Sequence, residues 1–507
     1  MSTSDFQLDL NKQVEVTLSQ LSDNGQVDSR FETTMKWINT VTDVRNLICQ
    51  RTGLSHDQID VIYGGKRLPK NFSLYQINVS SNHIQLYYNC RPRDSSADAW
   101  IHIVSPNPLD KVPIRSGGNN QKFLDALEDV RNGFHAGIKP ELSLYGSGGT
   151  YYLNDCNKWN LLVFKPEDEE PFAENNPRDL QGVTGHSGFR KGIKSGEGWK
   201  REVAAYIIDR NHLFSVPTTV QAHVRHPFFL QRCPSLRFKI GSIQYFVEDA
   251  DLCSDWSPSK YAIAEVQKIA FLDIYMMNTD RNDANILVQR RRNDQFTLVP
   301  IDHGYSLPDC FEINDLSWCW LDWKQAKEPW DPKLREFAEN MSVTDDVRLL
   351  NESLGIRKVC LLMLRVSGLL LKEGIRQGLT PLELASFYIR KEGPSTIEKI
   401  VQECVERVKY YQAARYSVME SNGGMSHSAN HLLTTEQREM VIRVMSTQSL
   451  SEIEFSDEPY RFPTDVEHKL THDRDYRRCF FSLYEESIAF WVATVISKRA
   501  DNEGLFI

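Results

Sequence analysis

Residues 273–304 read DIYMMNTDRNDANILVQRRRNDQFTLVPIDHG. The stretch holds two apolar segments that predict strands, and a polar side chain lies at the edge of each. Asp280 comes first, Asn285 follows five residues later, and Asp302 comes seventeen residues after that. This order and spacing are typical of the base and the metal ligands of kinase-type phosphotransferases. The stretch therefore predicts a phosphotransfer site.

Each residue of this motif has a candidate role. Asp280 is the candidate base, or the group that orients the acceptor hydroxyl. Asn285 and Asp302 are candidate ligands of Mg²⁺, with Mn²⁺ as an alternative, because Mg²⁺ prefers hard oxygen donors and keeps waters and ATP phosphates as further ligands. Arg281 joins the catalytic group because it could neutralise charge on the phosphates or pair with a nearby carboxylate. In the alternative interpretation these polar residues only cap and turn a loop, but the flanking strands argue against it.

A glycine-rich turn and a lysine lie upstream, in the order that a kinase needs. Glycines let backbone N–H groups approach phosphates closely, and Lys165 ends the next apolar strand, where it could reach the phosphates as a point charge. Glu202, in the first turn of a predicted helix at 200–213, could pair with Lys165, although the helix dipole alone also favours a glutamate there. The chain has no GxxxxGK[ST] motif. The predicted ATP-binding residues of the turn are Gly146, Ser147, Gly148 and Gly149.

A strand predicted at 241–247 leads into the acidic stretch 248–251. Such a crossing between two lobes is where an adenine ring would pair with backbone groups. The candidate hinge, chosen on position alone, consists of Gln244, Tyr245, Phe246 and Val247.

The N-terminal part predicts a separate β-grasp module. Strands, a helix and further strands follow in ββαββ order within about 80 residues, at 14–21, 30–37, 42–53, 59–63 and 83–88. The segment DQIDVIYGGKRL, residues 57–68, resembles the segment of ubiquitin that follows its helix, and the resemblance covers residues 12–90. The segment 89–93 lacks a terminal Gly-Gly, which implies an embedded ubiquitin-like domain without a role in conjugation.

Ile62 aligns with the isoleucine at the centre of the binding patch of ubiquitin. The resemblance implies a docking face for ubiquitin-receptor proteins. The alternative is an ordinary half-buried strand residue, because Gln85 and Tyr87 alter the other positions of the patch.

Composition bounds the remaining functions. The chain is 41% apolar over 507 residues and carries a formal net charge of −9, so it can bury at least two cores and is not a nucleic-acid-binding composition. The ten scattered cysteines form no CxxC pair, and the start of the chain shows no signal-peptide pattern. The longest apolar run, 359–371, is interrupted by Arg365 and is shorter than the roughly 20 residues of a membrane span, so it predicts a buried helix. We expect a protein of the cytoplasm or of a membrane surface, without a transmembrane segment.

The kinase motif carries a second resemblance. Asn278-Thr279-Asp280-Arg281, Asn285-Ile286-Leu287-Val288 and Pro300-Ile301-Asp302-His303-Gly304 resemble the catalytic and metal motifs of the type II phosphatidylinositol 4-kinase family, and most of all its plant gamma-type members. Thr-Asp-Arg and Asp-His-Gly replace the His-Arg-Asp and Asp-Phe-Gly of protein kinases. The resemblance implies ATP-dependent phosphorylation of phosphatidylinositol at its 4-hydroxyl, on a membrane that the enzyme contacts peripherally. The cysteine-rich palmitoylation run of animal type II enzymes is missing, since 228–239 holds one cysteine.

Two other functions stay open at this point. The first is a protein serine/threonine kinase, because ubiquitin-bearing members of this family are also implicated in protein phosphorylation. The second is a non-catalytic ubiquitin-like adaptor with a kinase fold, which the intact Lys165, Asp280, Asn285 and Asp302 argue against.

The expected fold class is α+β, with a β-grasp domain followed by a two-lobed kinase-like domain whose C-lobe is largely helical. Four tryptophans at 318–330 predict core rather than a membrane contact, and the basic run 190–194 predicts either a solvated loop or a contact with anionic headgroups. The expected division is a ubiquitin-like domain at 12–90, a linker at 91–121, a catalytic domain at 122–415 (N-lobe about 140–247, C-lobe about 255–415), a disordered linker at 416–434 and a tail of unknown role at 435–507.

Overall fold

The computed structural model describes residues 12–21, 27–52, 59–77, 82–90, 99–104, 118–232, 238–291, 295–314, 316–409 and 457–503. Several expectations lie outside these residues: the first hairpin turn at 22–25, the helix-ending Gly53, the cysteine at 233, and the linker at 416–434. By its internal contacts the chain divides into two units, Met1–His186 with Thr218–Phe246, and Ser187–Pro217 with Val247–Ile507. Each unit is considered by itself below.

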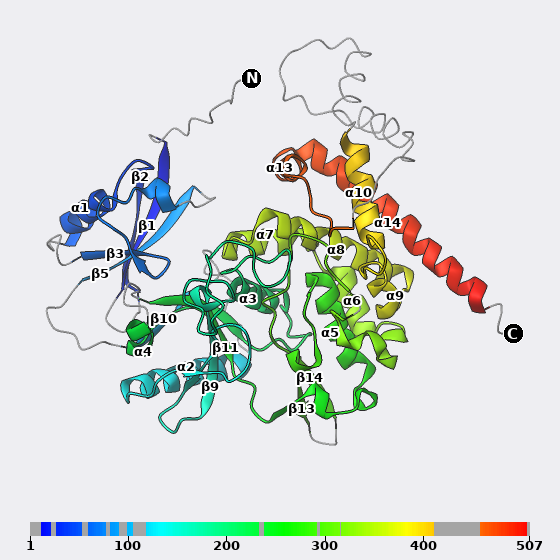
Figure 1. Ribbon diagram of the computed structural model, residues 1–507, viewed down its shortest axis with the longest axis horizontal. Coiled ribbons are helices and arrows are strands. Elements are labelled where there is room, and N and C mark those ends of the chain that lie inside the picture. The colour runs from blue at the N-terminus through cyan, green and yellow to red at the C-terminus, as the bar shows by residue number, and fades with distance from the viewer. Residues whose placement is uncertain are drawn as a thin grey trace, which may run out of the picture. The chain divides into compact units, whose positions relative to one another are not determined.

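The first unit begins with the β-grasp module (Figure 1, blue). Its sheet has the strand order β2-β1-β5-β3-β4, in which β1 and β5 are parallel and the other pairs are antiparallel. One face of this sheet buries an apolar core with α1, because alternate strand residues such as Val14, Val16 and Leu18 point inward. The elements are β1 (Gln13–Leu21), β2 (Val27–Lys36), α1 (Val41–Thr52), β3 (Ile59–Tyr63), β4 (Lys66–Arg67) and β5 (His83–Cys90). The strand order and the single helix confirm the predicted ubiquitin-like fold.

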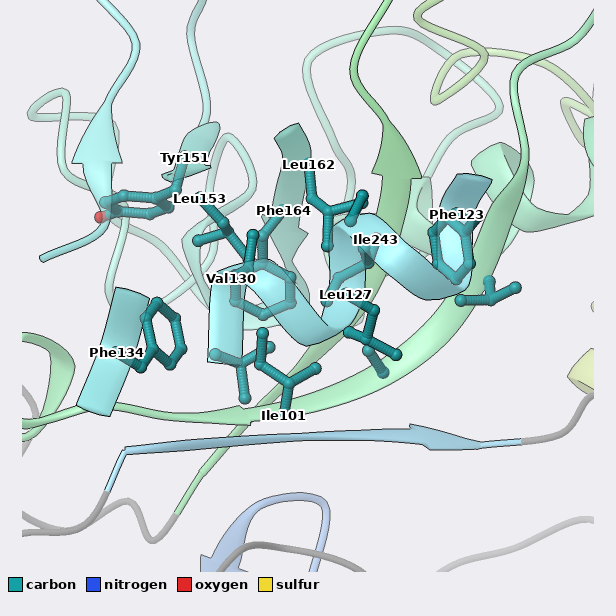
Figure 2. Close-up of a cluster of buried hydrophobic side chains, with 14 of the residues drawn as sticks. Ile101, Phe123, Leu127, Val130, Phe134, Tyr151, Leu153, Leu162, Phe164 and Ile243 are labelled. Carbon is teal, nitrogen blue, oxygen red and sulfur yellow. The ribbon is translucent and has the colours of Figure 1, made fainter. Parts of the chain in front are cut away.

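A second sheet completes this unit, in the order β6-β10-β11-β9-β8-β7, with every pair antiparallel. Helix α2 (Gly118–His135) covers one face, and Figure 2 shows its Phe123, Leu127, Val130 and Phe134 directed at apolar residues of the strands. The strands are β6 (Trp100–Val104), β7 (Glu141–Leu142), β8 (Tyr151–Asn154), β9 (Asn160–Pro166), β10 (Thr219–Arg225) and β11 (Lys239–Tyr245), with α4 at Pro227–Arg232. This sheet is the N-lobe.

The predicted linker at 91–121 is therefore only partly a linker. Trp100–Val104 forms β6, which pairs with Arg225–Gln221 of β10, and α2 already begins at Gly118. The composition of this range, rich in Pro, Ser and Gly, favours a loop, whereas β6 is held by a partner more than a hundred residues away. Such non-local pairing cannot be seen in a local window.

The second unit is mainly helical, as expected for a C-lobe. The strands predicted inside 273–304 form a hairpin that β12 extends to a three-stranded sheet. The long apolar helix α8 is buried along most of its length and lies among α5, α6, α7 and α14. The elements are α3 (Gly198–Ile208), β12 (Ala250–Leu252), α5 (Ile263–Met276), β13 (Ile286–Arg290), β14 (Phe296–Pro300), α6 (Pro332–Asn340), α7 (Val343–Leu354), α8 (Lys358–Gln377), α9 (Pro381–Ala385), α10 (Thr396–Lys409), α13 (Thr464–His472) and α14 (Arg474–Glu503).

Helix α3 differs from its expected place. The N-lobe was expected to include 187–217, but this segment groups with the C-lobe residues. Ion pairs hold it there: Glu197 pairs with Arg357, and Arg210 pairs with Asp346. The Arg201 guanidinium, 1% exposed, also donates to the Ser306 carbonyl over 2.6 Å.

The tail belongs to the C-lobe. Helix α14 packs on α8 and α10, and the buried Tyr484 hydroxyl donates to the Val366 carbonyl over 3.0 Å. The Arg365 guanidinium, which interrupts the longest apolar run, lies 3.7 Å from the centre of the Phe481 ring. Among the described helices, α14 has the length and hydropathy of a membrane span over Arg474–Arg499, but its contacts with α8 and α10 are those of a core helix.

The tryptophan cluster is mostly core, as predicted. Trp318, Trp320 and Trp330 are buried, and Trp323 is half-buried. Trp318 and Trp320 stack with ring centroids 5.2 Å apart. The observed architecture confirms the α+β fold class: a β-grasp module, a β-rich lobe and a helical lobe.

Candidate active site

The loop after α5 is organised by Arg281, which is fully buried. Its Nε lies 2.9 Å from Oδ1 of Asp273 in the last turns of α5, and Nη1 donates to the carbonyls of Asn285 (2.6 Å) and Ile301 (2.5 Å). Nη2 donates to Nδ1 of His303 over 3.1 Å, so the neutral ring carries its hydrogen on Nε2, which faces the Pro300 carbonyl. Arg281 thus ties α5, the Asn285 turn and the Asp302 segment together.

This arrangement corrects one part of the Arg281 prediction. The side chain pairs with a carboxylate, which was one of the two alternatives, and its buried contacts leave it facing the protein interior rather than a phosphate. Two tryptophans complete the support from below. Trp320 Nε1 donates to Asp273 Oδ2 over 3.0 Å, and Trp318 Nε1 donates to the Asn278 carbonyl over 2.7 Å.

Asp280 projects from this loop and its side chain is 22% exposed. Its backbone is fixed at both ends: the N–H donates to Asn278 Oδ1 (2.9 Å), and the carbonyl accepts from Asn285 Nδ2 (2.8 Å). Burial raises the pKa of Asp280 above its usual value, Asp302 raises it further, and the Arg190 guanidinium at 2.6 Å lowers it. The carboxylate is therefore a stronger base than an ordinary aspartate, and one oxygen is held by a cation.

Asn285 and Asp302 present oxygen atoms on either side of this carboxylate. The Asn285 amide nitrogen is engaged with Asp280, so its Oδ1 is the atom suited to a metal. Asp302 is exposed and has a φ of 60°, a left-handed conformation that costs a non-glycine residue about 1 kcal/mol. Backbone strain of this kind is typical of functional sites. The donors are hard oxygens, which fit Mg²⁺, and among the described residues no cluster of three or more His, Cys, Asp or Glu side chains forms a metal cage.

Glu202 lies on α3 and is buried. Its Oε1 comes within 3.6 Å of the point where a Cβ on Gly304 would stand, so it borders the Asp-His-Gly segment of its own unit. Lys165 lies on β9 opposite Ser242 of β11 in the other unit. The pairing of Lys165 with Glu202 remains a prediction.

The glycine turn between β7 and β8 is held by residues that the sequence did not indicate. Gly149 N–H donates to the Glu169 carbonyl over 2.8 Å, and Asn176 Nδ2 donates to the Ser147 carbonyl over 2.9 Å. The Glu169 side chain, 1% exposed, accepts from the Tyr151 hydroxyl (2.5 Å) and pairs with Lys239 (2.7 Å). Burial raises the pKa of Glu169, and Lys239 opposes this shift.

We predict that Gly149→Ala weakens ATP binding and destabilises the N-lobe. A Cβ at Gly149 would stand 2.3 Å from Glu169 Oε2 and 2.6 Å from Glu169 Cβ, so the turn or the buried glutamate must move. Overpacking of this kind costs about 1–3 kcal/mol. The KM for ATP and the thermal midpoint measure both effects.

Gly148→Ala is the matched control for this substitution. Its Cβ would meet its nearest neighbour, Pro171, at 3.4 Å, an ordinary contact. We expect a clearly smaller change in KM and midpoint than for Gly149→Ala. Equal effects of the two alanines would contradict the role given to Glu169.

The candidate hinge lies at the end of β11. Gln244 is buried and its Nε2 donates to Thr219 Oγ1 over 2.9 Å, while Tyr245 N–H donates to the Thr218 carbonyl over 2.8 Å. Phe246 N–H donates to the Leu161 carbonyl over 3.0 Å. The division between the two units falls between Phe246 and Val247, which is where the sequence placed a crossing between lobes.

Comparison with known families assigns the class of this site. Residues 146–384 match the family model described as phosphatidylinositol 3- and 4-kinase. The chain therefore carries a PI3/PI4-kinase domain, and kinases of this family are ATP-dependent and typically use a divalent metal. The match includes the glycine turn, Lys165, Asp280, Asn285 and Asp302.

The relatives narrow the class to a gamma-type phosphatidylinositol 4-kinase sequence. The protein named phosphatidylinositol 4-kinase gamma 4 from Oryza sativa subsp. japonica is 37% identical over 322 residues, which cover 61% of this chain and 57% of the relative. The protein of the same name from Arabidopsis thaliana is 36% identical over 326 residues, covering 60% of this chain and 57% of the relative. Phosphatidylinositol 4-kinase gamma 3 from Arabidopsis thaliana is 34% identical over 363 residues, 67% of this chain and 62% of the relative. The chain thus spans somewhat more than half the length of these relatives.

Among solved structures, Caldiarchaeum subterraneum ubiquitin matches with 19% identity and a TM-score of 0.15, covering 17% of this chain and 100% of its own. The ubiquitin-like domain of Plasmodium falciparum Dsk2 matches with 16% identity and a TM-score of 0.14, covering 16% of this chain and 100% of its own. The assignment of the ubiquitin-like fold rests on the observed strand order of the module.

Proposed function

We propose that this protein is a Mg²⁺- and ATP-dependent kinase that transfers the γ-phosphate of ATP to the 4-hydroxyl of phosphatidylinositol. The observation that carries the proposal is the Asp280 carboxylate, held by its backbone beside Asn285 and close enough to Asp302 for the two charges to interact. The sequence match to a PI3/PI4-kinase domain supports the same conclusion. The domain division supports it too: a ubiquitin-like module, then an N-lobe that begins at β6, then a C-lobe that includes the tail helices.

We assign the nucleotide to the residues that the sequence indicated. The backbone of Gly146, Ser147, Gly148 and Gly149 would cover the phosphates, with Lys165 directed at them and held by Glu202. The backbone at Gln244, Tyr245, Phe246 and Val247 would receive the adenine ring. Asn285 and Asp302 would hold Mg²⁺ or Mn²⁺, which neutralises the charge that develops on the phosphates.

Asp280 performs the proton transfer in this proposal. Its carboxylate accepts the proton of the acceptor hydroxyl while that oxygen bonds to the γ-phosphorus and the bond to the leaving ADP oxygen breaks. Arg281 does not touch the reactants. It fixes the Asn285 and Ile301 carbonyls, so that the base and the metal ligands keep their spacing.

Residues around Asp280 suit an acceptor in a lipid surface. Phe189, 54% exposed, precedes the Arg190 that pairs with Asp280, and Leu316, 85% exposed, precedes the Ser317 whose carbonyl accepts from Arg281. Apolar side chains beside a cationic one are suited to a membrane interface. We propose that Phe189 and Leu316 contact the membrane and that Arg190 transfers from Asp280 to the lipid phosphate, which places the protein in the cytoplasm and peripherally on membranes.

We predict that Arg190→Gln shifts the acid limb of the activity profile to higher pH. Arg190 lowers the pKa of Asp280, so its removal raises that pKa, and Asp280 must be deprotonated to act as a base. The profile of kcat against pH measures the shift. Lys191→Gln is the matched control, because Lys191 pairs with the exposed Glu458 instead. A profile unchanged by Arg190→Gln, or shifted equally by both variants, would contradict the coupling.

The acceptor is tested by offering two substrates together. Purified full chain receives labelled ATP, Mg²⁺, phosphatidylinositol vesicles and a generic protein substrate, with Asp280→Asn alongside. We expect label in the lipid, at the 4-position after chromatography of the headgroup. Label in protein alone would indicate a protein kinase, and no label above the variant would indicate a non-catalytic fold. The ubiquitin-like module adds a further proposed partner, a ubiquitin-receptor protein that binds at Ile62.

A further inference from the structure

The ubiquitin-like module has an apolar face opposite its core, formed by Leu21 of β1, Ile62 of β3 and Tyr87 of β5, here called the Ile62 face. In a free module this face would be open to solvent. In the protein Ile62 is 0% exposed, Leu21 4% and Tyr87 8%, so the face is covered.

The cover comes from the N-lobe sheet of the same unit. Trp100 at the start of β6 and Phe238 just before β11 form one cluster with the Ile62 face, and both are buried. The Phe238 ring lies 6.1 Å from the Tyr87 ring and 5.6 Å from the Trp100 ring. It stacks on His223 of β10 at 4.6 Å, and His223 meets Tyr87 at 4.9 Å.

The chemistry of this contact is that of a dry interface. His223 is 1% exposed and burial lowers its pKa to about 3, so the ring is neutral and packs as an aromatic group. The backbones also touch: Phe238 N–H donates to the Gly65 carbonyl over 3.4 Å, and a Cβ on Gly65 would stand 2.1 Å from the Phe238 oxygen. Only glycine allows this approach. Beside it, Lys66 stabilises the Glu174 carboxylate across the contact.

We propose that the kinase N-lobe is the resident partner of the Ile62 face, and that a ubiquitin receptor gains this face only by displacing Trp100 and Phe238. The ubiquitin-like module is then closed against its partners in the resting protein. The proposal does not depend on the kinase reaction, since every residue in it lies away from the phosphotransfer motif.

The connection between the two modules makes the closed state competitive. Nine residues, 91–99, join β5 to β6, and a tether of this length holds two surfaces at an effective concentration in the millimolar range. A receptor in solution must compete with that concentration. Its apparent affinity is lowered by the fraction of molecules whose face is open.

Hydroxyl-radical footprinting of the full chain tests the closed state. Tyr87 should be labelled much more slowly than Tyr75, which lies in the same module and is 45% exposed. Phe238→Ala on one side and Ile62→Ser on the other should each raise Tyr87 labelling several-fold without changing Tyr75. Phe189→Ala serves as the matched phenylalanine control and should change neither. Tyr87 labelling equal to that of Tyr75 in the wild type, or unaltered by both interface variants, would overturn the proposal.

Competition supplies the second readout. The probe is an acidic amphipathic helix of the ubiquitin-receptor type, labelled for fluorescence anisotropy, because Lys66 and Arg67 flank Ile62 on the strand pair. We expect Phe238→Ala to bind it at least tenfold more tightly than the wild type, and Phe238→Ala with Ile62→Ser to lose that gain. Equal binding by wild type and Phe238→Ala would show that the face is not closed.

Discussion

Asp280→Asn should reduce kcat by about 10²–10⁴ while leaving the fold and ATP binding intact. Asparagine has the same shape but cannot take the proton of the acceptor hydroxyl. The contacts that position residue 280, with Asn278 and Asn285, use its backbone and survive the change. Arg190 loses its partner, but it is 42% exposed, so the cost to stability is about 0–1 kcal/mol.

The measurement is the initial rate at saturating ATP with phosphatidylinositol vesicles, together with ATP affinity by calorimetry and the thermal midpoint. Asp302→Asn provides the contrast, because it removes a charged metal ligand instead of the base. That variant should raise the Mg²⁺ concentration required for half-maximal rate, whereas Asp280→Asn should not. A rate for Asp280→Asn within tenfold of the wild type would remove Asp280 from the role of base.

The motif residues could be predicted because their function depends on local chain order. Asp280, Asn285 and Asp302 lie at the ends of one hairpin, and a hairpin fixes the positions of its ends from its own sequence. The same holds for the β-grasp module, whose strands and helix are each signalled within a short window. These features survived the step from sequence to structure with boundaries shifted by a few residues.

What the sequence could not show are the partners that meet from distant parts of the chain. Glu169 and Asn176 beneath the glycine turn, Arg190 on Asp280, and Phe238 over Ile62 all join segments far apart in sequence. Each residue has an ordinary surface identity when seen alone. Arg281 was half-predicted for the same reason: its type indicated an anion, and only the packing of α5 shows that the anion is Asp273.

Arg281→Met should be the most destabilising of these substitutions, by about 3–5 kcal/mol, because it leaves Asp273 as an uncompensated buried carboxylate. Burial raises the pKa of Asp273 and Arg281 opposes that shift, so without the arginine the carboxyl favours protonation. A raised pKa in the folded state costs stability above the unfolded value, so the deficit should grow as pH rises from acid toward neutral. Activity should fall as well, because the Asn285 and Ile301 carbonyls lose their donor.

Urea unfolding of the full chain, followed by tryptophan fluorescence, measures this effect, since Trp318 and Trp320 lie directly against the loop and Asp273. Arg190→Met is the matched control: it also removes an arginine from an aspartate of the same loop, but the pair is partly exposed and should cost about 0–1 kcal/mol. The two variants thus separate the two pairs of the Asp-Arg motif. One ion pair holds the loop together and the other adjusts the base, so Arg281→Met should lose stability and rate together, whereas Arg190→Met should alter the pH dependence at nearly full stability. Equal losses of stability in both variants would mean that burial does not distinguish them.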